Sequence, residues 1–130
     1  AVEEPAARLL VVDDNPANRE LLARRLERKG YRVTRAEDGY RALEVLASEA
    51  IDLVLLDLMM PDMDGWDVYQ QMKADEQLRL IPVIVVTAKA QNIDKVLGLH
   101  IARVDDYISK PFSPQELVDS IESVLARFTQ

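Results

Sequence analysis

Five residues whose side chains can bind a metal ion or a phosphoryl group follow short apolar runs of this chain. They are three aspartates, a threonine and a lysine: Asp13, Asp14, Asp57, Thr87 and Lys110. A carboxylate can act as a phosphoryl acceptor, and a hydroxyl or an ammonium can hydrogen-bond phosphate oxygens. As a set they predict phosphoryl chemistry, although each residue alone has an ordinary structural interpretation as a cap, strand or surface residue.

Each of these residues comes at the end of a short, mostly apolar run. The runs occupy residues 9–12, 53–56, 83–86 and 107–109. Continuous apolar runs of this length are typical of strands buried on both faces of a parallel sheet. Ligands bind beyond the carboxyl ends of such strands. We therefore expect the three carboxylates, the hydroxyl and the ammonium to converge in one crevice.

Crowding of Asp13, Asp14 and Asp57 would be unfavourable without a cation, because like charges repel. A ligand set of oxygen atoms, with no His or Cys, favours Mg²⁺ and also accommodates Mn²⁺. For Asp13 or Asp14 taken alone, the alternative is a residue that caps the following helix. The combination with Asp57 at another strand end favours the metal site.

The pattern between the runs alternates strands with amphipathic helices, which predicts an α/β domain with a parallel sheet. A further strand is expected at 31–36. Helices are expected from Pro16, with Asn15 as its cap and Gly30 as its end, at 39–48, 65–74 and 92–101, and from Pro114 onward, with Ser113 as its cap. Leu21, Leu22 and Leu26 are the expected buried face of the first helix.

The five residues also form a family signature. An acidic pair, an Asp that ends a buried strand, Thr87 followed by Ala88, and Lys110 followed by Pro111 resemble, as a set, the receiver domain of two-component response regulators. The resemblance extends over about residues 8–127. It implies a doubly wound, flavodoxin-like sheet of five parallel strands in the order 2-1-3-4-5, with helices on both faces.

The resemblance also implies roles for the residues. Asp57 would be the phosphoacceptor, and Mg²⁺ would be bound by Asp13, Asp14, Asp57 and the backbone carbonyl of Met59. The phosphoryl donor would be a histidine kinase or a histidine phosphotransfer protein. Such a domain assists its own phosphorylation and dephosphorylation but has no separate turnover substrate, so it is not expected to be an enzyme in its own right.

A switch is implied as well. Thr87 and Lys110 would contact the phosphoryl group, and Tyr107 would turn inward when Thr87 moves toward the phosphate. The surface formed by the fourth helix, the fifth strand and the fifth helix would then change. The downstream partner or output domain cannot be named from the sequence.

Size and composition narrow the classes of protein to which this chain can belong. At 130 residues and without Cys, the chain is expected to be one domain (8–130) after a flexible tail (1–7), in a reducing cytoplasm. A net charge of −7 argues against direct binding of nucleic acid, and no run is long enough to cross a membrane. A basic cluster at 24–29 is either a solvated helix face or a docking patch.

Two other functions deserve comparison. A haloacid-dehalogenase-like phosphatase carries a second Asp two residues after its nucleophile, where this chain has Met59. A pseudo-receiver that only binds partners would not need the complete set of acids, Thr and Lys. Both alternatives therefore fit the sequence less well than a phosphoaccepting receiver.

Overall fold

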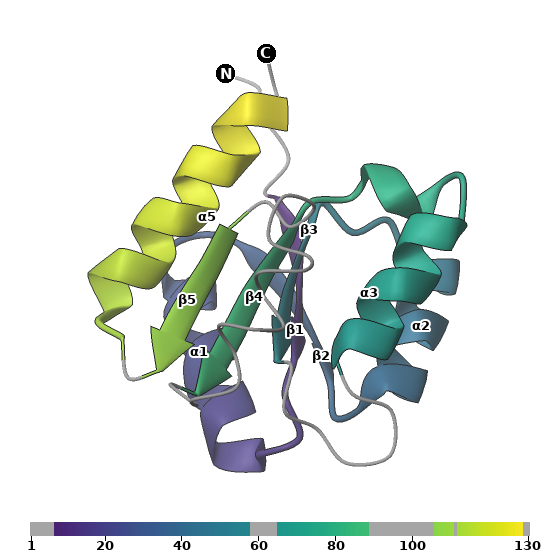
Figure 1. Cartoon of the computed structure of the whole chain (residues 1–130). Helices are drawn as coiled ribbons and strands as arrows, with labels where there is room; N and C mark the ends of the chain where they lie inside the picture. The colour runs from purple at the N-terminus through teal and green to yellow at the C-terminus, as the bar shows by residue number, and fades with distance from the viewer. Residues whose placement is uncertain (1–6, 58–64, 89–105, 111, 129–130) are drawn as a thin grey trace.

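A parallel sheet flanked by helices makes up the described part of the protein (Figure 1). The computed structural model describes residues 7–57, 65–88, 106–110 and 112–128. The strands are β1 (Arg8–Val12), β2 (Arg32–Ala36), β3 (Leu53–Asp57), β4 (Val83–Ala88) and β5 (Asp106–Lys110). The helices are α1 (Pro16–Arg28), α2 (Gly39–Ser48), α3 (Gly65–Ala74) and α5 (Pro114–Phe128), with a 3₁₀ turn η1 (Leu78–Leu80). The helix expected at 92–101 lies outside the described residues.

The strands pair in the order β2-β1-β3-β4-β5, and every pair is parallel. This confirms the predicted fold class and strand order. Because β1 and β3 are neighbours in the middle of the sheet, Val12 pairs with Leu56, and the residues that follow them lie side by side. The order therefore brings the acidic pair next to Asp57.

Burial on both faces explains why the inner strands β1, β3 and β4 have continuous apolar runs. Leu10 and Leu56 belong to the core cluster under α2 and α3, whereas Leu9 and Leu55 belong to the cluster under α1 and α5. All four are fully or almost fully buried. Figure 1 shows the same division, with α2 and α3 on one side of the sheet and α1 and α5 on the other. Successive strand residues thus anchor opposite faces, which holds the strand ends in place.

Local signals in the sequence set the ends of α1. The Asn15 side chain caps the helix by accepting a hydrogen bond from the Asn18 N–H (3.0 Å), and Pro16 occupies the first turn. These are favoured residues at the two positions. Gly30 follows the helix with a φ of 98°, a conformation that costs glycine little. The predicted start and end of this helix are confirmed.

The predicted buried face of α1 was wrong at one residue. Leu22 and Leu26 are buried, but Leu21 is 52% exposed. Successive helical residues are rotated by about 100°, so a face centred between Leu22 and Leu26 turns the preceding Leu21 toward solvent. Ala23 lies on the other side of that face and is buried instead.

Side-chain caps also start two other helices. Asp38 accepts a hydrogen bond from the Arg41 N–H at the start of α2 (2.8 Å). The Ser113 hydroxyl accepts one from the Glu116 N–H at the start of α5 (3.1 Å), as the Ser-Pro sequence predicts. Strand β5 leads toward this second cap, so the cap places the helix directly after the carboxyl edge of the sheet.

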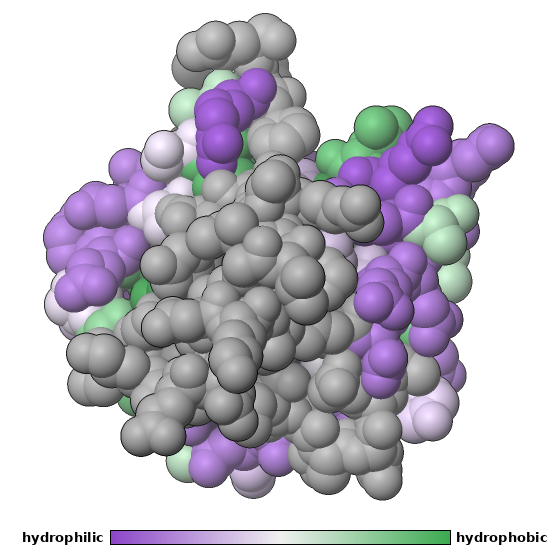
Figure 2. All heavy atoms as spheres, in the orientation of Figure 1, coloured by the Kyte–Doolittle hydropathy of each residue, from purple (hydrophilic) through white to green (hydrophobic). Residues whose placement is uncertain are grey.

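The described surface is mostly hydrophilic in the view of Figure 2, and hydrophobic colour is confined to small patches. The large apolar side chains that are exposed in the described residues are Leu21, Tyr40 and Leu80. Within the same residues, no helix combines the length and the hydropathy that a membrane span requires.

An ion-pair network joins α1 to the edge strand β2. The Arg35 guanidinium contacts Glu20 (2.9 Å) and Glu27 (3.0 Å), and Arg24 also contacts Glu20 (3.1 Å). The hydrogen bonds from Arg35 and then Arg24 hold the pKa of the Glu20 carboxyl below its usual value. The folded state therefore favours the charged form of Glu20.

This network predicts a pH-dependent contribution to stability. Because the pKa of Glu20 is lowered by folding, its contribution is present above the ordinary carboxyl range and is lost as the pH falls through the lowered pKa. Glu20→Gln should lower Tm relative to wild type at about pH 7, and the difference should shrink at about pH 3. Glu44→Gln, which removes only an exposed contact to Arg41 (3.4 Å), is the matched control and should change Tm little. A Glu20→Gln deficit that persists at low pH would contradict this interpretation.

Candidate functional site

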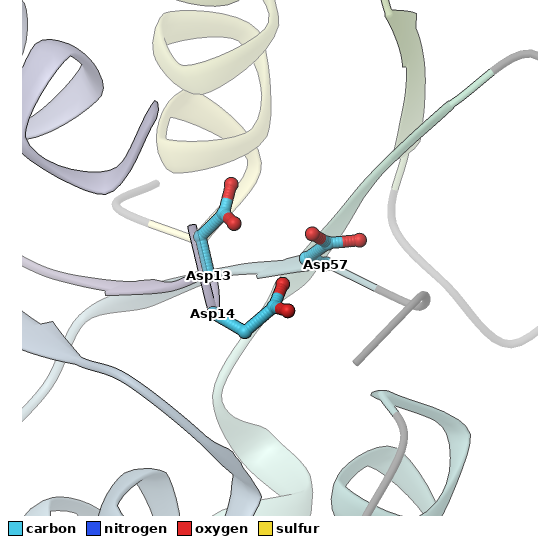
Figure 3. A group of neighbouring side chains, drawn as sticks. All are labelled: Asp13, Asp14 and Asp57. Carbon is cyan, nitrogen blue, oxygen red and sulfur yellow. The ribbon is translucent and has the colours of Figure 1, made fainter. Parts of the chain in front are cut away.

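The three predicted acids meet at the carboxyl edge of β1 and β3. One carboxylate oxygen from each of Asp13, Asp14 and Asp57 lies within 4.8 Å of the other two. Figure 3 shows that Asp13 and Asp14 follow β1 and that Asp57 ends β3, with the side chains gathered around the gap between the two strands. The structure thus brings together the acids that the sequence singles out.

Asp13 is held in place from several directions. Its backbone N–H donates to the Ala36 carbonyl (3.2 Å), and its Oδ1 accepts a hydrogen bond from the Asn15 N–H (2.9 Å). The side chain is buried, with 2% of its surface exposed. Asn15 is the cap residue of α1, so neither Asp13 nor Asp14 has the capping role considered as their alternative.

Asp14 differs from its two neighbours because it is exposed, whereas Asp13 and Asp57 are buried. Its carboxylate makes no hydrogen bond to the residues that the structure describes. Two buried carboxylates therefore form the floor of the site, and one exposed carboxylate stands at its solvent side.

The donor set fits a hard divalent cation. The described ligand atoms are carboxylate oxygens, and Mg²⁺ prefers one or two carboxylates together with water or phosphate oxygens. A bound cation would also offset the repulsion among the three charges. Asp13, Asp14 and Asp57 are the described residues that would hold it. Met59, expected to add a backbone carbonyl, lies outside the described residues.

The backbone register places Thr87 and Lys110 at the same edge of the sheet. Asp57 pairs with Val86 of β4, so Thr87 is the next residue toward the carboxyl end. Ala88 pairs with Lys110 on β5. The side chains of Thr87, Tyr107 and Lys110 lie outside what the structure describes, so the roles expected for these side chains remain predictions.

One residue near the site was missed by sequence reasoning. Nη1 of Arg19, in the second turn of α1, donates a hydrogen bond to the Asp13 carbonyl (2.9 Å). The only sequence signal is an Arg placed shortly after an acidic pair at the start of a helix. This signal is weak, because an Arg in that position usually belongs to the solvent face.

The basic cluster at 24–29 is divided between two surroundings. Arg24 pairs with Glu20, whereas Arg25, Arg28 and Lys29 line a groove of about 210 Å³ against the first turns of α5. The docking interpretation of these three residues stays a prediction.

Comparison with known proteins identifies the family. Residues 9–122 match the response regulator receiver domain. The chain belongs to this family. The regulatory protein PhoP of Bacillus subtilis, named for alkaline phosphatase synthesis, is 42% identical over 120 residues, which are 92% of this chain and 49% of that protein. The phosphate regulon regulatory protein PhoB of Pseudomonas aeruginosa is 42% identical over 119 residues, which are 92% of this chain and 52% of that protein.

Solved receiver structures agree with the fold. A signal receiver domain of a histidine kinase from Syntrophus aciditrophicus has a TM-score of 0.88 and 32% identity, covering 96% of this chain and 94% of that one. In contrast, the chain spans about half the length of the curated relatives it matches. Receiver domains are signalling modules that bind a divalent metal in an acidic pocket, and the three aspartates form such a pocket here.

The metal site predicts a specific response to Asp14→Asn. Loss of one charge relieves repulsion, so the metal-free variant should have a higher Tm than the metal-free wild type. Mg²⁺ should raise the Tm of the wild type, because it binds only the folded state, and should raise that of the variant much less. Thermal unfolding with Mg²⁺ and with a chelator measures both effects. Glu76→Gln, which neutralises an exposed acid after α3, should respond to Mg²⁺ like wild type. Equal Mg²⁺ responses in Asp14→Asn and wild type would refute the assignment.

Proposed function

We propose that this receiver domain, residues 8–130, accepts a phosphoryl group on Asp57 in a Mg²⁺-dependent reaction. The observation that carries the proposal is the buried carboxylate of Asp57 at a strand end, within 4.8 Å of two further carboxylates. The phosphoryl donor would be a phosphohistidine of a histidine kinase or of a phosphotransfer protein. The relatives are response regulators, which supports a donor of this kind.

The reaction would transfer a phosphoryl group from a histidine nitrogen of the donor to a carboxylate oxygen of Asp57. A carboxylate oxygen of Asp57 forms a bond to phosphorus while the phosphorus–nitrogen bond of the donor breaks, and the imidazole nitrogen keeps the electron pair. The product is an acyl phosphate on Asp57 and a neutral donor histidine after protonation. When bound, Mg²⁺ would offset the negative charge that accumulates at the three carboxylates and the phosphoryl oxygens.

Thr87 and Lys110 are proposed to bind the phosphoryl oxygens once Asp57 is modified. Thr87 lies one residue before the end of β4 and Lys110 ends β5, at the edge where Asp57 ends β3, which supports this role. A hydroxyl donates one hydrogen bond, and an ammonium adds a positive point charge. Movement of Thr87 toward the phosphate would change the room available to Tyr107, and so the surface near β5.

The output that this domain would control is a separate question from the chemistry at Asp57. PhoP and PhoB are named as transcriptional regulatory proteins, and each is about twice as long as the matched region. By analogy, we propose that phosphorylation here governs an output supplied by another chain segment or another protein. A direct contact of this acidic domain with nucleic acid is not part of the proposal, because a net charge of −7 disfavours one.

The first test is covalent labelling. Incubation with acetyl phosphate and Mg²⁺ should add one phosphoryl group by intact mass, because Asp57 is the buried strand-end carboxylate beside the metal site. Asp57→Ala should not be labelled. Asp52→Asn, at the opposite end of β3, is the matched control and should be labelled like wild type.

Labelling of Asp57→Ala to the wild-type extent would place the acceptor elsewhere. If no variant and no wild-type protein accepts phosphate from acetyl phosphate or from a phosphorylated histidine donor, the domain is a pseudo-receiver that acts by binding alone.

The second test concerns the switch. Beryllofluoride, which mimics a phosphoryl group on an aspartate, should change amide hydrogen exchange mainly at residues 87–112. The reason is that Thr87, Tyr107 and Lys110 couple the phosphate to that part of the chain. Residues 39–48 of α2 serve as the internal control and should change little. A stronger response at 39–48 than at 87–112 would show that the proposed coupling is wrong for this protein.

A further inference from the structure

The peptide group between Asp13 and Asp14 is held by a hydrogen bond from a side chain of α1. Nη1 of Arg19 donates to the Asp13 carbonyl oxygen at 2.9 Å, and the Arg19 side chain is half-buried. Because a peptide group is planar, a contact that fixes the carbonyl of Asp13 also fixes the direction of the Asp14 N–H and Cα. The contact therefore bears on the orientation of Asp14.

The two acids depend on this contact to different degrees. Asp13 is already held by Asn15 and Ala36 and is buried. Asp14 is exposed, and its carboxylate has no hydrogen bond to the described residues, so its position follows from the backbone alone. A rotation of the peptide between the two acids would change the direction of the Asp14 side chain relative to Asp57.

We propose that Arg19 is a positioning residue for the divalent-cation site, which orients Asp14 by holding the peptide that joins it to Asp13. The proposal deepens the proposed function and rests on it. In this role Arg19 would orient a metal ligand from outside the ligand set, and its effect would reach the ion through the backbone.

The positive charge of Arg19 and its hydrogen bond to the Asp13 carbonyl predict opposite effects on the affinity for a divalent cation when Arg19 is removed. Removal of a cation from the neighbourhood of three carboxylates would by itself strengthen the binding of a divalent cation. Loss of the hydrogen bond to the Asp13 carbonyl would weaken cation binding, because Asp14 would have to be ordered when the ion binds. Positioning thus makes a prediction that a purely electrostatic role cannot reproduce.

The helix itself does not depend on the guanidinium. The Arg19 backbone N–H bonds to the Asn15 carbonyl (2.9 Å), and Asn15 and Pro16 supply the cap and first turn. Arg19→Met keeps most of the apolar stem and removes the hydrogen-bond donors. It is therefore expected to fold, and Arg19→Gln serves as a second variant if it does not.

The experiment measures Mn²⁺ binding by electron paramagnetic resonance, which counts the free ion and needs no phosphorylation. Arg19→Met should bind Mn²⁺ about tenfold more weakly than wild type, at the low end of the range for outer-shell partners. Arg19→Lys, which retains a donor and the charge, should recover part of this loss. Arg24→Met is the matched control, because it removes the same charge from α1 at a residue whose ion pair among the described residues is with Glu20, and it should bind like wild type or slightly tighter.

A second measurement follows the backbone without any metal. The amide resonances of Asp14 and Asn15 should shift or broaden in metal-free Arg19→Met and stay at their wild-type positions in Arg24→Met. Mn²⁺ binding by Arg19→Met that equals or exceeds wild type would overturn this inference and leave the proposed function intact. Absence of Mn²⁺ binding in the wild type would overturn both.

Discussion

Repulsion among three carboxylates is the constraint on which this structure depends. Asp13, Asp14 and Asp57 bring oxygen atoms within 4.8 Å of one another, and two of these side chains are buried. The repulsion is weaker where exposed Asp14 is involved, because solvent screens its charge. A fold that keeps this arrangement must hold it by packing, and the same repulsion is what gives a divalent cation its affinity.

The sheet supplies the packing. Each central strand places successive residues in two different cores, so the strand ends are fixed from both faces. Parallel pairing puts the ends of β1, β3, β4 and β5 at one edge, and the strand order places β1 beside β3. A small change at that edge has few ways to relax within the core. We expect it to be expressed in the segments that follow the strands, which suits a signalling module.

The strands and helix ends that could be predicted from the sequence depend on local composition and on the spacing of apolar residues. Continuous apolar runs revealed the buried strands, and Asn15, Gly30 and Ser113 revealed helix ends, because both depend on local chemistry. The strand order did not follow from these patterns and came from the resemblance to a family. Leu21 was misplaced because a Leu beside two buried leucines looks equivalent in sequence, and only the packing angle of the helix decides which is covered. The contact from Arg19 to the Asp13 carbonyl was missed, because a backbone acceptor leaves no mark on the sequence.

We propose that these three aspartates form one cation site at which Asp57 is modified. The most direct measurement is anomalous diffraction from crystals grown with Mn²⁺ and beryllofluoride. We expect one strong manganese peak among Asp13, Asp14 and Asp57, with oxygen ligands and with the beryllofluoride bonded to Asp57. A manganese peak elsewhere, or beryllofluoride absent from Asp57 while the ion is bound, would contradict it.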